Sequence, residues 1–168
     1  MNTSTATRKP RKVSLAKSRT VTESAAHAHY TKLDANLQPL PRTAKTHAAV
    51  HDARTGLVWD VTTHEAKTHA HAVEMAGQVH LGDQSDWRLP ERNELIGITD
   101  LSRFDPCIDT EFFPKTPSRF FWSNTAYAPN PAGFAWGVNF NNGLSNYYDR
   151  DSDLDVRAVR GPVVRPGQ

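Results

Sequence analysis

The stretch that decides the fold runs from Phe120 to Tyr148 and reads FFWSNTAYAPNPAGFAWGVNFNNGLSNYY. Short runs of aromatic and β-branched residues alternate in it with turns that are rich in Asn, Gly and Pro. Such runs favour strands, and Asn-Gly turns are typical of hairpins. The sequence therefore predicts an antiparallel sheet, with strands at Phe120 to Trp122, Phe134 to Phe140, Leu144 to Tyr148 and Val156 to Val159.

A first helix is predicted ahead of this sheet, from Ala66 to Val79. Apolar residues recur there at helical intervals, and Gly82 suits a helix stop. Thr62 and Glu65 have the spacing of a capping box at the other end. We therefore expect an amphipathic helix of roughly four to five turns.

A second, shorter helix is predicted after Leu89, because Pro90 suits a first helical turn. A strand-like run from Gly56 to Val61 precedes both helices. Helices that come first and an antiparallel sheet that follows indicate the α+β class. The expected architecture is two helices packed on a twisted antiparallel sheet.

Charge divides the chain of 168 residues into two unlike parts. Residues 1–50 carry nine Lys or Arg against two acids, a charge of +7, and the remainder carries eleven against sixteen, a charge of −5. The first part is rich in Thr, Ser, Ala and Lys and lacks an apolar period. We predict a flexible basic tail at residues 1–46, one folded domain at 47–163 and a short tail at 164–168.

The basic tail suggests nucleic acid as a partner, since clustered cations bind phosphates without sequence preference. A solvated tail without a function is the alternative. The residues concerned are Arg8, Lys9, Arg11, Lys12, Lys17 and Arg19.

Apolar runs give no reason to expect a membrane partner. No run approaches the roughly 20 apolar residues of a membrane-spanning helix, and the first thirty residues lack the apolar core of a secretory signal. Cys107 is the single cysteine, so no intramolecular disulfide can form. A cytoplasmic protein with a buried Cys107 is expected.

Five runs of sequence together resemble a known family. They are Asp52 to Trp59, Asp86 to Pro90 leading into Glu94-Leu95, Ile108-Asp109 to Phe113-Pro114, Phe121 to Ser123, and Val156 to Gly161. In their order and spacing they resemble the Lcl carboxy-terminal domain family of bacterial and phage proteins. The resemblance covers about two thirds of the chain. It implies a fold related to C-type-lectin-like and formylglycine-generating-enzyme-like domains, and it brings no catalytic residue with it.

The matching runs have mainly structural explanations. The four tryptophans are expected in the core, with an exposed stacking platform as the alternative. Arg88 is expected to hold a carboxylate or carbonyls in the loop before the second helix. The tryptophans are Trp59, Trp87, Trp122 and Trp136.

No catalytic site is predicted, and we expect a protein that is not an enzyme. Formylglycine-generating enzymes use a cysteine pair with copper, and this chain has only Cys107. The sequence also lacks a Gly-x-Ser-x-Gly elbow, a phosphate-cradling glycine loop and a His-Glu-x-x-His pair.

Two groups of side chains raise the question of a metal. His64, His69 and His71 lie close together, but their spacings do not share one helix face, so we expect exposed histidines. Four carboxylates alternate further on, and in an extended strand they would point to one side and could attract Ca²⁺. A solvated acidic loop or a charged edge strand is the alternative, and no other cofactor is expected. The four are Asp149, Asp151, Asp153 and Asp155.

Tyr and Asn crowd the late loops, and both residue types serve recognition surfaces well. The alternative is that the Asn residues only form turns. The leading hypothesis is a recognition module that binds a protein or a glycan through these loops. The candidate ligand-binding residues are Asn124, Tyr127, Asn130, Asn142, Asn146, Tyr147 and Tyr148.

Two other functions remain open. One is a nucleic-acid-associated protein that uses the basic tail. A role of a phage protein against its host is compatible both with this function and with the recognition module. The other is a variable protein of a diversity-generating retroelement, because such proteins also carry lectin-like domains with late loops dense in Asn and Tyr.

Overall fold

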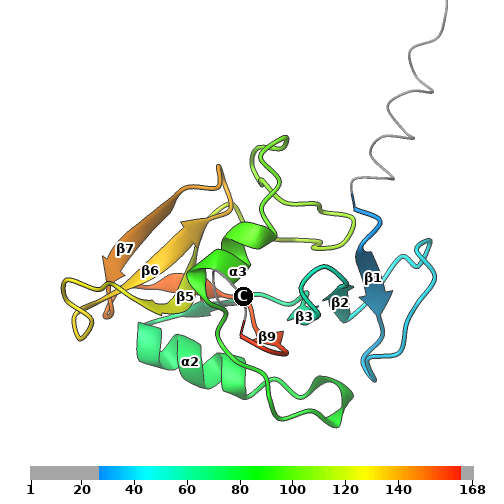
Figure 1. Cartoon of the computed structure of the whole chain (residues 1–168), viewed down its shortest axis with the longest axis horizontal. Helices are drawn as coiled ribbons and strands as arrows, with labels where there is room; N and C mark the ends of the chain where they lie inside the picture. Colours follow the sequence, from blue (N-terminus) through cyan, green and yellow to red (C-terminus); the bar gives the residue numbers. More distant parts are fainter. Residues whose placement is uncertain (1–26, 164–168) are drawn as a thin grey trace, which may run out of the picture.

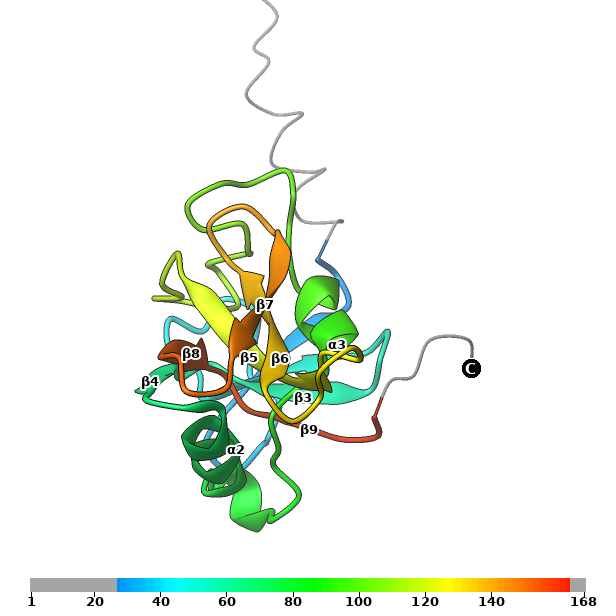
Figure 2. The same ribbon diagram turned by 90° about the vertical axis from the view of Figure 1, so that its left-hand side faces the viewer.

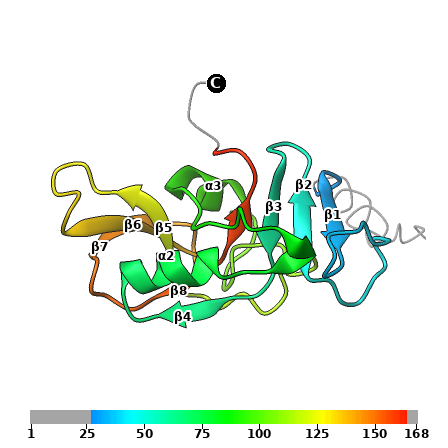
Figure 3. The same ribbon diagram turned by 90° about the horizontal axis from the view of Figure 1, so that it is seen from below.

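Two β-sheets organise the computed structural model, which describes residues 27–163. The first sheet has the order β1 (Tyr30–Leu33), β2 (Ala49–Asp52), β3 (Leu57–Asp60) and β9 (Val159–Arg160). The second has the order β4 (His64–Ala66), β8 (Leu154–Val156), β5 (Phe120–Ala126), β6 (Phe134–Asn139) and β7 (Ser145–Asp149). Neighbouring strands are antiparallel except β5 and β8, which are parallel. Figure 3 shows the two sheets toward opposite ends of the molecule.

The α+β class and the late strands are confirmed. The predicted strand from Val156 to Val159 is instead divided between β8 and β9, which belong to different sheets. Arg157 lies at the crossing and is fully buried. Its Nη1 donates to the carbonyl oxygen of Asp60 at 2.9 Å, and its Nη2 donates to Oγ1 of Thr116 at 2.6 Å. These bonds anchor the crossing between the sheets and offset part of the cost of burying a cation, whose Nε is buried without a hydrogen-bond partner among the described residues.

The first helix is shorter than predicted. Helix α2 spans His69–Gly77, and Oγ1 of Thr68 caps it by accepting from the amide of His71. The residues where the helix was expected to begin form β4 instead, because β8 offers them backbone partners. Only His69, Ala72 and Ala76 of α2 are buried, and a short 3-10 helix, η1 (Leu81–Asp83), follows.

The second helix is α3 (Arg92–Gly97), close to where it was predicted. Glu91 caps it in a capping box with Glu94. Arg88 holds Glu94 with two hydrogen bonds of 2.8 Å, so the expected carboxylate partner is found. Glu94 is buried, and this pair fixes the start of α3 against the chain that precedes it.

The two helices cover opposite faces of the second sheet (Figures 1 and 2). Side chains alternate along β5, so Phe121 packs with Leu95 of α3, whereas Trp122 packs in another cluster with Ala72 and Ala76 of α2. The first cluster also contains Trp59 and Cys107, and the second contains Trp87. The prediction of a core position is therefore confirmed for Trp59, Trp87, Trp122 and Cys107.

The folded part begins earlier than the predicted boundary at residue 47. Strand β1 pairs with β2, from Tyr30 opposite Asp52 to Leu33 opposite Ala49. Tyr30 and Leu33 are buried, so residues 30–33 contribute to the core rather than to a tail. Strand β1 was not predicted because Thr31 and Lys32 interrupt the apolar pattern of residues 30–33. The predictions for residues 1–26 and 164–168 lie outside the described residues.

Within residues 27–163, none of the helices has the length and apolar composition needed to cross a membrane.

Candidate functional site

Four aromatic side chains gather on one face of the β6–β7 hairpin. Phe134 and Trp136 are two residues apart on β6 and therefore point to the same side. Tyr147 of β7 lies directly opposite Trp136 in the sheet register, and Tyr127 follows the end of β5. We call Tyr127, Phe134, Trp136 and Tyr147 the aromatic cluster.

The rings of the aromatic cluster support one another. Tyr127 and Trp136 meet with centroids 5.7 Å apart, and Trp136 and Tyr147 meet at 5.9 Å with planes 84° apart. Phe134 and Tyr147 meet edge to face at 5.7 Å. Each such pair contributes about 0.5–1.5 kcal/mol beyond the area that it buries. The cluster therefore holds its rings in fixed orientations.

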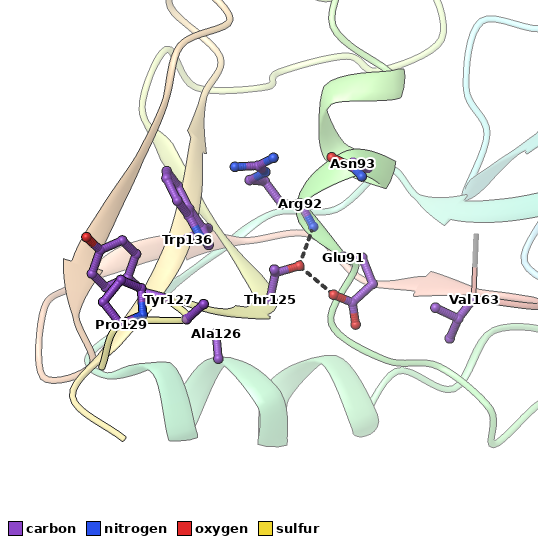
Figure 4. Close-up of a pocket in the computed structure, with 10 residues that line it drawn as sticks. Glu91, Arg92, Asn93, Thr125, Ala126, Tyr127, Pro129, Trp136 and Val163 are labelled. Carbon is purple, nitrogen blue, oxygen red and sulfur yellow. Dashed lines mark hydrogen bonds between the residues drawn. The ribbon is translucent and has the colours of Figure 1, made fainter. Parts of the chain in front are cut away.

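A pocket of about 610 Å³ lies beside the aromatic cluster, between the start of α3 and the end of β5 (Figure 4). Tyr127 and Trp136 form its aromatic wall, and Arg92 lies over the Trp136 ring, with its guanidinium carbon 4.6 Å from the centroid. We call it the aromatic pocket. Its lining residues are Glu91, Arg92, Asn93, Thr125, Ala126, Tyr127, Ala128, Pro129, Trp136 and Val163.

A hydrogen-bond network joins α3 to β5 at the base of the aromatic pocket. Oγ1 of Thr125 accepts from the amide of Arg92 at 2.9 Å and donates to the carboxylate of Glu91 (Figure 4). The side-chain amide of Asn124 donates to the same carboxylate at 3.1 Å. Because Glu91 also caps α3, one carboxylate ties the helix start to the strand. The polar wall of the pocket is thereby set before any ligand enters.

The structure brings together only part of the predicted ligand-binding set. Tyr127 and Tyr147 belong to the aromatic cluster, and Asn124 contributes to the network below the pocket. Tyr148 lies on the opposite face of the sheet, where it packs against Phe120 at 4.8 Å and Trp122 at 6.4 Å.

The side chains of the remaining three predicted residues accept hydrogen bonds from backbone amides one to three residues further along the chain. Oδ1 of Asn130 accepts from the amide of Gly133, and Oδ1 of Asn142 accepts from that of Leu144, both at 3.1 Å. Oδ1 of Asn146 accepts from the amide of Tyr147 at 3.0 Å. The turn-forming role that the sequence offered as the alternative fits Asn130 and Asn142, whereas Asn146 lies within β7.

Trp136 corrects the expectation that all four tryptophans are core residues, because it is half-buried and lines the aromatic pocket. Sequence reasoning also missed Arg92 and Thr125. Counting outward from the Asn141 to Gly143 turn would have placed Trp136 and Tyr147 on one face, since facing residues share a side of a hairpin. No local pattern connects Arg92 with that face.

The histidines do not behave as a group. His69 is buried, contrary to the expectation of an exposed residue. Its Nε2 donates to the carbonyl oxygen of Ser123 at 2.9 Å, which leaves Nδ1 to accept from Nη1 of Arg150 at 2.6 Å. Burial lowers the pKa of His69, and the nearby Arg150 charge lowers it further. His64 lies apart from it on β4.

The four carboxylates of the predicted Ca²⁺ site do not converge. Asp149 ends β7 and accepts from the amide of Asp151 in the next turn, whereas Asp155 is buried in β8. Among residues 27–163, no group of three or more His, Cys, Asp or Glu is arranged to hold a metal ion. Burial raises the pKa of Asp155 to about 6, although Nη1 of Arg119 lies 3.6 Å away.

Comparison with known proteins gives one match. The family model described as the Lcl C-terminal domain matches residues 48–160. The matched part contains both helices and every strand except β1, so it includes the aromatic cluster. No curated protein matches the chain.

Proposed function

The chain belongs to the Lcl C-terminal domain family, and we propose that it is a non-catalytic recognition module that binds a glycan in the aromatic pocket. The observation that carries the proposal is that the aromatic wall of Tyr127 and Trp136 lies beside the hydrogen-bond network between α3 and β5. A protein ligand, which the sequence left open, is the alternative.

The size of the aromatic pocket favours a small unit such as one or two sugar rings. Ligand pockets commonly measure about 300–1,000 Å³, and the aromatic pocket has about 610 Å³. A protein partner would instead cover about 800 Å² of a flatter surface. A concave site of this volume therefore supports a saccharide better than a protein face.

The chemistry of the lining supports the same ligand. Tyr147 stacks on one face of Tyr127 and Arg92 lies over the Trp136 ring, so the other face of Tyr127 and the remaining surface of Trp136 offer apolar area for the C–H groups of a sugar ring. The hydroxyl of Tyr127 and the side-chain amide of Asn93 have no hydrogen-bond partner among residues 27–163, so both remain available to sugar hydroxyls.

The absence of catalysis is also proposed, and the contacts of Glu91 support it. The carboxylate of Glu91 accepts from Asn124, from Thr125 and from the backbone in the capping box. A carboxylate held in this way serves the helix and the strand, which leaves it poorly placed for proton transfer to a ligand.

A glycan array probed with the labelled full-length chain tests the proposal. We expect binding to a defined set of glycans, and at least a tenfold loss of affinity, about 1.4 kcal/mol, in Tyr127→Ala and in Trp136→Ala. Phe104→Ala is the matched control, because Phe104 is an exposed ring that does not line the aromatic pocket. Thermal melts confirm that all variants are folded. Binding to no glycan, or equal binding by all three variants, contradicts the proposal.

A further inference from the structure

A second pocket shares no lining residue with the aromatic pocket. It has a volume of about 430 Å³ and is formed by the segments before β2, after β3 and after Phe113. We call it the lysine pocket, after Lys45 and Lys115 in its lining. Lys45, Thr46 and His47 precede residue 48, where the family match begins, so part of this pocket lies outside the matched domain.

Charge distinguishes the lysine pocket from its surroundings. Two other cations nearby, Lys32 and Arg42, share the carboxylate of Glu111. Among residues 27–163, neither Lys45 nor Lys115 forms an ion pair. Two lysines without acidic partners in one concave lining favour an anion there.

The polar groups of the lining point to the same ligand chemistry. The hydroxyls of Thr46 and Thr63 have no hydrogen-bond partner among the described residues, so both can donate to oxygen atoms. Nε2 of His47 donates to the carbonyl oxygen of Phe112 at 2.6 Å, while its Nδ1 is buried without a partner. An anion nearby would stabilise the imidazolium form of His47, in which both ring nitrogens donate.

The backbone at the lysine pocket is strained. Lys115 has a φ of 57°, in the left-handed region that residues other than glycine seldom adopt. Backbone strain of this kind often occurs at ligand-binding sites. Val61 and Pro114 add apolar surface to the same lining, which suits an organic group attached to the anion.

We propose that the lysine pocket binds a small organic phosphate. Lys45, Lys115 and the threonine hydroxyls receive the phosphate group, and Val61 and Pro114 contact the organic group. The dianion of a phosphate monoester matches the two unpaired lysines in charge. This site is independent of glycan binding in the aromatic pocket, so either proposal can fail without the other.

The test is an NMR titration of the full-length chain with inorganic phosphate and with phenyl phosphate at pH 7.5 and constant ionic strength. We expect saturable shifts of the His47 ring nitrogens, a rise in the pKa of His47, and tighter binding of phenyl phosphate. Lys45→Gln and Lys115→Gln are each expected to weaken binding about tenfold, the effect of losing one charged hydrogen bond.

Lys67→Gln is the matched control, because it removes the same charge from an exposed lysine that does not line the lysine pocket. It should leave both affinities unchanged. Shifts that chloride reproduces at equal ionic strength, or equal weakening by all three variants, would overturn the site. Phenyl phosphate that binds no more tightly than inorganic phosphate would overturn the role of Val61 and Pro114.

Discussion

Tyr127 and Tyr147 stack with their ring centroids 4.0 Å apart and their planes 15° apart. Tyr127 follows the end of β5, whereas Tyr147 belongs to β7, and β6 lies between these strands in the sheet. Tyr147 thus supports the ring that forms the wall of the aromatic pocket, although Tyr147 itself does not line it.

Alanine substitutions at Tyr147 and Tyr148 should affect glycan binding differently. Tyr147 is 41% exposed and meets three rings of the aromatic cluster, so Tyr147→Ala should lower glycan affinity and also lower the free energy of unfolding. Tyr148 packs against Phe120 and Trp122, so Tyr148→Ala should lower the free energy of unfolding by about 2 kcal/mol or more and spare binding. Urea unfolding and binding assays on both variants check this, and the reverse pattern would place the binding face on the α2 side.

Removal of residues 1–46 should destabilise the domain more than removal of residues 1–26. The longer deletion takes away β1, including the buried side chains of Tyr30 and Leu33, each worth about 1.5–3 kcal/mol. It also exposes the edge of β2. Thermal melts and size-exclusion chromatography of the two shortened proteins make the comparison. Equal melting temperatures would mean that β1 contributes nothing to stability.

Arg88→Ala should lower the free energy of unfolding by about 3–5 kcal/mol, because it removes the cation that pairs with the buried carboxylate of Glu94 and leaves that charge to the Glu91 amide and other neutral donors. Arg160→Ala is the control, since Arg160 pairs with Asp86, whose side chain is 54% exposed, and such pairs contribute less than about 1 kcal/mol. Chemical denaturation measures the free energy of unfolding of both variants. Similar losses in the two would contradict the idea that burial makes the Arg88–Glu94 pair more important than the exposed pair.

His69 should remain neutral at pH 7, with its proton on Nε2. Burial lowers its pKa below the ordinary value of 6.5, so the unfolded chain binds the proton more tightly. The stability contributed by His69 is therefore present above pH 6.5 and is lost as the pH falls below it. Nitrogen NMR of the ring reports the tautomer and the pKa. A pKa above 6.5, or a proton on Nδ1, would be inconsistent with the bonds to Ser123 and Arg150.

Asp155→Asn should stabilise the protein at pH 7.5 by up to about 3 kcal/mol, since the pKa of Asp155 is raised from 3.8 to about 6. The folded state binds the proton more tightly between these values, so the wild type loses stability as the pH rises through them. The advantage of the variant should vanish near pH 4. Asp153→Asn, at an exposed neighbour, should change little at either pH. Unfolding curves at both pH values test the prediction, and a destabilised Asp155→Asn at pH 7.5 would show that attraction to Arg119 outweighs burial.

Local chemistry determined much of the fold. The alternation of aromatic runs with Asn and Gly turns predicted β5, β6 and β7, and the Pro90 to Glu94 pattern predicted α3. The same level of reasoning failed at β4, because residues 64–66 suit a helix start when considered alone. Their strand conformation depends on backbone partners in β8, which lie about ninety residues away.

Only the tertiary structure decided which side chains share a site. The sequence indicated Tyr127 and Tyr147, but sheet register placed Trp136 beside them and turned Tyr148 to the other face. In the same way, packing brought Lys45 and Lys115 to one pocket from segments seventy residues apart. Secondary-structure propensity and helix capping act over a few neighbouring residues, so they can be predicted from the sequence. Which side chains share one face of a sheet or one pocket depends on pairing and packing between distant segments.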